Sequence, residues 1–161
     1  MIPDPFDVAL FARRLEERNG RQIRLVPMPT VHGAPCGLWV QVERTDYVFY
    51  TTNTTRLHQT HIVLHEFGHV VLDHQGCSDN KTILQLLSPD LDPTLIGRML
   101  CRSGVDDGSA EEEAAETFAD LILAPRALTA RSYDLPPAPD LPAEVAQVVA
   151  NIEQAWGRGP R

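Results

Sequence analysis

The chain has 161 residues, 43% of them hydrophobic, which is enough to bury a core and predicts one globular domain over residues 1–161, or one domain with a short appendage. Its 14 basic and 22 acidic residues give a net charge of −8, and the arginines near the N-terminus alternate with Glu16 and Glu17. Because an acidic surface without a separate basic patch repels phosphate groups, direct binding of nucleic acid is not expected.

Cysteine usage and apolar segments indicate the compartment. Cys36, Cys77 and Cys101 are odd in number and widely spaced, which predicts neither a disulfide framework nor a cysteine zinc site. No stretch reaches the roughly 18 apolar residues of a membrane span, and the N-terminal MIPDPFDVAL lacks the pattern of a secretion signal. We therefore expect a soluble cytoplasmic protein, with no membrane partner and with an oligomeric state that the sequence leaves open.

The first part of the chain predicts one helix and a small sheet. The helix starts after Asp4 or Asp7 and stops at Asn19–Gly20. Three runs rich in β-branched and aromatic residues follow, QIRLVPM, CGLWVQV and DYVFYTT. They predict about three antiparallel strands, with residues 44–46 as the hairpin connection between the second and the third.

Helices dominate the rest of the predicted fold. Residues 51–55 are a run of capping residues before a long helix over about 57–75, and a short helix is expected over 92–101. A further helix runs from 109 to about 124, and a proline cluster then links it to a last helix within 134–161. The expected class is α+β, with a small antiparallel sheet packed against a helical bundle.

The long predicted helix contains HIVLHEFGHVVLDH, in which His65, Glu66 and His69 form the pattern His-Glu-x-x-His. At 3.6 residues per turn His65 and His69 point to one spot, and Glu66 lies about 100° from His65. Two imidazoles and a neighbouring carboxylate suit a zinc ion and a general base, the parts of a metalloprotease. Apolar residues surround this helix, so an unpartnered histidine pair would be costly, which favours the metal site over a core helix with satisfied histidines.

A catalytic zinc site needs a third protein ligand besides the two histidines. The segment SAEEEAAETFADLILAP places Glu111 and Glu112 at the border of an apolar helical stripe, and periodicity does not choose between them. Glu112 also fits a capping box with Ser109, in which it would only cap the helix. A longer pattern with a third histidine fails, because Leu72 and Gln75 occupy its glycine and histidine positions.

Two motifs carry a family resemblance, HEFGH and a later E-x-x-A-x-x-F-A with a leucine-rich end at a proline. The matching residues are His65, Glu66, His69, Glu112, Ala115, Phe118, Ala119, Leu121, Leu123 and Pro125. Together they resemble the ImmA/IrrE family of zinc metallopeptidases. The resemblance implies a minimal gluzincin-like fold, Zn²⁺ as the cofactor, Glu112 as the third ligand and Glu66 as the catalytic base.

The same resemblance implies a substrate and a supporting residue. Family members cleave or inactivate helix-turn-helix repressors, so we expect an endopeptidase acting on an intracellular DNA-binding repressor, with a role in transcription regulation and stress response. Members usually carry Asn or Asp four residues after the third ligand, to support a zinc-binding histidine, and Glu116 stands there in this chain. The alternative function is a zinc-containing module that sequesters a regulatory protein without cutting it.

In gluzincin-like folds the substrate pairs as an extra strand with the sheet edge next to the zinc helix. The run before the predicted zinc helix is therefore the candidate substrate strand, with an ordinary core strand as the other interpretation. Its residues are Tyr47, Val48, Phe49 and Tyr50. For the group that stabilises the oxyanion, Tyr133 and His32 both remain open.

Overall fold

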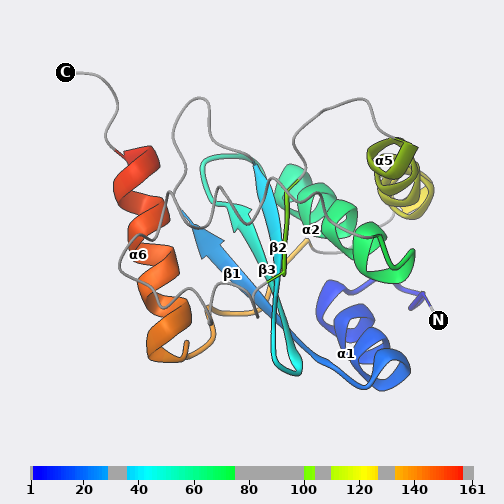
Figure 1. The fold of residues 1–161 in the computed structure, drawn as a ribbon. Coiled ribbons are helices and arrows are strands. Elements are labelled where there is room, and N and C mark those ends of the chain that lie inside the picture. Colours follow the sequence, from blue (N-terminus) through cyan, green and yellow to red (C-terminus); the bar gives the residue numbers. More distant parts are fainter. Residues whose placement is uncertain (1, 29–35, 75–99, 104–109, 127–132, 158–161) are drawn as a thin grey trace.

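The chain forms a small sheet with helices on both faces (Figure 1). The computed structural model describes residues 2–28, 36–74, 100–103, 110–126 and 133–157. In chain order the elements are α1 (Val8–Asn19), β1 (Gln22–Met28), β2 (Gly37–Val42), β3 (Thr45–Thr51), α2 (Arg56–Val71), β4 (Leu100–Ser103), α5 (Ala110–Leu123), the 3-10 turn η1 (Ala124–Arg126) and α6 (Ala143–Gly157). The predicted α+β class is confirmed, and the single domain over residues 1–161 stays a prediction.

Helix α1 begins and ends where the sequence predicts. The Asp7 carboxylate accepts a hydrogen bond from the Leu10 backbone N–H at 2.7 Å, which satisfies one of the free amides of the first turn. Gly20 has a φ of 67°, and its N–H donates to the Glu16 carbonyl at 2.8 Å. Since a left-handed residue ends a helix most easily when it is glycine, Gly20 fixes the point at which the chain turns into β1.

The sheet is mixed, whereas the sequence predicted a purely antiparallel sheet. Its strand order is β1-β3-β2-β4. β2 pairs with β3 and with β4 in antiparallel register, whereas β1 pairs with β3 in parallel register. The hairpin turn lies at Glu43 and Arg44, because Thr45 and Asp46 already belong to β3. Only a short turn forces antiparallel neighbours, and β1 is not joined to β3 by such a turn, so it can run parallel.

Each face of the sheet is covered by different helices, as Figure 1 shows with α6 on one side and α1 and α2 on the other. Side chains of β3 alternate between the two, because successive residues of a strand point to opposite faces. Val48 and Tyr50 pack in the cluster with α1, α2 and α5, and Phe49 packs in the cluster with Val145 and Val148 of α6. The predicted C-terminal helix thus completes the second layer of core.

The predicted substrate strand is wrong. β3 lies inside the sheet and pairs with β1 on one side and β2 on the other, so it has no free edge for a peptide. Its side chains are buried on both faces, namely Tyr47, Val48, Phe49 and Tyr50. The physical reason is that a run of alternating apolar residues marks a buried strand but does not tell which strands become its neighbours.

Helices α2 and α5 approach each other closely at a glycine. A Cβ atom at Gly68 would lie 2.9 Å from the Ala115 Cα and 3.1 Å from the Ala115 carbonyl oxygen. The nearest atoms that the new Cβ would meet belong to the backbone of α5, so no change of side-chain rotamer could relieve the clash. Gly68, inside the His-Glu-x-x-His pattern, therefore sets the spacing between the two helices.

We expect Gly68→Ala to loosen the α2–α5 contact and to destabilise the protein. Overpacking costs about 1–3 kcal/mol, and the better helix propensity of alanine offsets up to about 1 kcal/mol of this. The free energy of unfolding of the metal-free protein, measured by urea titration, should therefore fall by about 1–2 kcal/mol. Unchanged or increased stability would show that α5 can move away without cost.

Candidate metal centre

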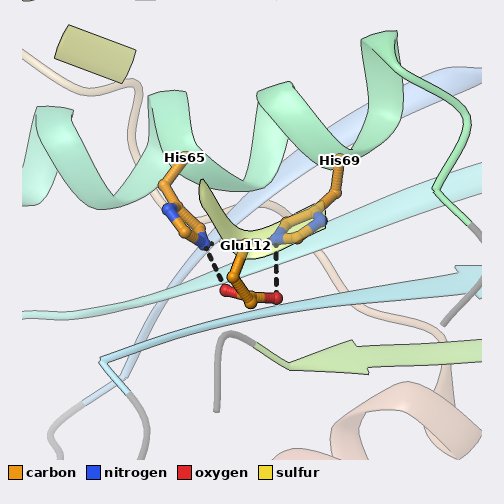
Figure 2. Close-up of side chains that lie close together, drawn as sticks. All are labelled: His65, His69 and Glu112. Atoms are coloured by element: carbon orange, nitrogen blue, oxygen red, sulfur yellow. Dashed lines mark hydrogen bonds and ion pairs between the residues drawn. The ribbon is translucent and has the colours of Figure 1, made fainter. Parts of the chain in front are cut away.

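Three side chains from two helices converge between α2 and α5 (Figure 2). The Nε2 atoms of His65 and His69 lie 3.1 Å apart. The Glu112 carboxylate faces both, with Oε2 at 3.2 Å from His65 Nε2 and Oε1 at 3.3 Å from His69 Nε2. Two imidazole nitrogens and a carboxylate so close together are a donor set that could hold a metal ion.

The structure distinguishes the two glutamates that periodicity left open. Glu112 belongs to the group with His65 and His69, and Glu111 does not belong to either group of potential ligands found among the described residues. The side chains of His69 and Glu112 are 4% and 17% exposed, so the group is sheltered by the two helices. Ser109, the predicted capping partner of Glu112, lies outside the described residues.

Both histidines are also held through their second ring nitrogen. The Nδ1 of His65 lies 3.1 Å from Oε2 of Glu116, which as a carboxylate must be the acceptor. The Nδ1 of His69 lies 2.9 Å from the Nδ1 of His74. Partners on Nδ1 fix the orientation of the rings and leave both Nε2 atoms for a metal ion.

His74 reaches His69 through the way α2 ends. Asp73 has a φ of 52°, and the His74 N–H donates to the His69 carbonyl at 3.1 Å. This is the pattern in which a helix closes on a left-handed residue and brings the following side chain back over the last turn. The contact was not predicted from the sequence, although Asp73, two residues past the end of α2 at Val71, is of a residue type that adopts the left-handed conformation more readily than most.

Glu66 is adjacent to His65 in the sequence, and its buried side chain lacks a full set of hydrogen-bond partners among the described residues. Its side chain is among the largest that are fully buried, and its Oε2 has no hydrogen-bond partner among the described residues. Burial, and to a smaller degree the Glu112 carboxylate, raise the pKa of Glu66 well above its ordinary value. A buried carboxyl group with a raised pKa, next in sequence to one of the potential metal ligands, is a candidate for proton transfer.

Comparison with family models, with curated proteins and with solved structures gave no match. The function must therefore be inferred from the residues of this chain and their geometry.

The remaining predicted site residues are the two candidates for the oxyanion group, Tyr133 and His32. The Tyr133 hydroxyl donates to the Arg126 carbonyl at 3.4 Å, and the ring packs against the core. His32 lies outside the described residues, so the identity of the oxyanion group stays a prediction.

In the described part of the chain, no helix has the length and apolar character needed to cross a membrane.

Proposed function

We propose that this protein is a zinc-dependent endopeptidase. The observation that carries the proposal is the set of donor separations of 3.1, 3.2 and 3.3 Å among His65, His69 and Glu112. In a tetrahedron with zinc–ligand bonds of the usual 2.0–2.1 Å, neighbouring ligand atoms lie about 3.3 Å apart. Three such ligands with one open position are the arrangement of a catalytic rather than a structural zinc site.

The chain supplies the remaining parts of a hydrolytic site. Zinc bound there would lower the pKa of a water molecule and polarise the carbonyl of the bond to be cleaved. Glu66 would take a proton from that water at its free Oε2 and later deliver it to the departing amine. Glu116 and His74 would keep the two imidazoles in place throughout, since each contacts a ring nitrogen that faces away from Glu112.

We propose that the substrate peptide pairs with β4. Among the described strands β1 and β4 form the two edges of the sheet. Leu38 of β2 pairs with Ser103 of β4, and a Cβ atom at the preceding Gly37 would lie 2.5 Å from Oε1 of Glu66. If an extended peptide were added beside β4, only β4 would separate the peptide from β2, whose Gly37 backbone contacts the base. This placement replaces the incorrect one on β3.

A DNA-binding repressor inside the cell is the substrate we propose, on the strength of the resemblance to ImmA/IrrE peptidases. The experiment is to incubate the zinc-loaded protein with candidate repressors and to map new N-termini by mass spectrometry. We expect cleavage at a few bonds, prevented by a zinc chelator and restored by added Zn²⁺. Intact substrates under all zinc-loaded conditions would contradict the proposal.

Gly37→Ala should impair catalysis without changing zinc binding. The new Cβ would lie 2.5 Å from Oε1 of Glu66 and 2.7 Å from Cγ2 of Ile62, so the carboxylate must shift. A misplacement of about 1 Å can reduce the rate about 100-fold. The rate of cleavage and the zinc content should be measured on the same preparation. An unchanged rate would show that β2 does not hold the base in position.

A further inference from the structure

Helices α2 and α5 face each other with a ladder of histidines and carboxylates that extends beyond the candidate metal centre. The histidines on α2 recur every four residues, as do the carboxylates on α5, so each set lies along one face of its helix. The histidines are His61, His65 and His69, and the carboxylates are Glu112, Glu116 and Asp120. Moving from His69 towards His61 along α2 corresponds to moving from Glu112 towards Asp120 along α5.

The next step of this ladder brings together a second group of potential ligands. His61 Nε2 lies 3.3 Å from Oδ1 of Asp120 and 3.5 Å from Oε1 of Glu116. One donor atom from each of the three residues lies within 4.8 Å of the other two. As in the first group, nitrogen and carboxylate oxygen atoms from both helices point to one spot.

We propose that His61, Glu116 and Asp120 form a second binding site for a divalent metal ion. Two carboxylates against one imidazole leave an excess of negative charge that a cation would neutralise. One nitrogen and two carboxylate ligands form a harder donor set than the two histidines and one glutamate of the first site, and suit Zn²⁺ or Mn²⁺.

The second site is more open than the first and should be weaker. The exposed fractions of the Glu116 and Asp120 side chains are 54% and 68%, against 17% for Glu112. Exposed ligands must give up more hydration and side-chain freedom when they bind, and solvent screens their charges. A metal ion there should exchange readily and be lost on dialysis.

Glu116 connects the two sites. Its Oε2 accepts from Nδ1 of His65, a residue of the first site, while its Oε1 faces His61. Replacing Glu116 would therefore disturb both sites at once. His61 and Asp120 do not belong to the first group of potential ligands, so these two positions can be changed to test the second site.

The test is calorimetric titration of Zn²⁺ into the full chain after its metal has been removed by a chelator. We expect one tight and one weaker equivalent per chain. Asp120→Asn and His61→Gln should each weaken the second equivalent at least about tenfold, the smallest effect typical of losing even an indirect support of a metal ion. The tight equivalent should be unchanged in both variants.

Glu113→Gln is the matched control, because it removes one exposed carboxylate from α5 outside both groups of ligands. It should bind Zn²⁺ like the unmodified protein. A single equivalent in the unmodified protein, or a second equivalent with unchanged affinity in Asp120→Asn and His61→Gln, would overturn the proposal. Absence of the tight equivalent would instead count against the peptidase, so the two failures can be told apart.

Discussion

Replacing Glu66 by glutamine should reduce cleavage of the substrate about 10²–10⁴-fold, the usual contribution of a general base. Glutamine has nearly the same shape but accepts no proton at neutral pH. Because burial raises the pKa of Glu66 and its Oε2 has no partner in the described structure, the fold gains little from the ionised carboxylate. We therefore expect normal folding and an unchanged tight zinc equivalent, measured by circular dichroism and metal analysis beside the cleavage rate.

Glu113→Gln serves as the control for this variant too, since it makes the same chemical change on the exposed surface of α5. Its cleavage rate should match that of the unmodified protein. The alternative function, sequestration of a regulatory partner, makes the opposite prediction for Glu66→Gln. If that variant still inactivates the partner as efficiently, the protein acts by binding and the peptidase proposal is wrong.

Glu112→Ala should weaken the tight binding of zinc by more than about 100-fold, the upper end of the effect of losing an indirect support. The two histidines would remain, but the carboxylate that faces both Nε2 atoms would be gone. Competition with a chromophoric chelator measures the affinity. The expected consequence is loss of cleavage at zinc concentrations that saturate the unmodified protein.

Glu111→Ala provides the comparison for Glu112→Ala, because the two glutamates are adjacent and only one faces the histidines. Glu111→Ala should bind zinc normally. The reverse result, with zinc lost from Glu111→Ala and kept by Glu112→Ala, would mean that α5 presents a different face to α2 in solution.

The central parts of the site could be predicted because they depend on spacing within one helix. His65 and His69 are four residues apart, so any helix over this segment brings them together. The choice of Glu112 over Glu111 could not be made from periodicity, since both border the apolar stripe of α5. It depends on how α5 is rotated against α2, which is fixed by the close contact of Gly68 with Ala115.

Features that depend on distant segments were missed. Residues 92–99 of the predicted helix over 92–101 lie outside the described residues, and its last two residues, Leu100 and Cys101, belong to strand β4. A strand of four residues is too short to show a pattern, and it exists because it pairs with β2. The parallel position of β1 beside β3 was also not predictable from local signals. The contact between His69 and His74 depends on the left-handed turn at Asp73, which the predicted helix over 57–75 ran past.

The most direct test of the zinc site is elemental analysis of the purified protein after extensive dialysis, with Glu66→Gln and Glu112→Ala treated in parallel. The geometry of His65, His69 and Glu112 predicts one zinc ion per chain in the unmodified protein and in Glu66→Gln, and close to none in Glu112→Ala. A chain that retains no zinc, and takes none up when Zn²⁺ is supplied, would contradict the assignment of this site and of the function built on it.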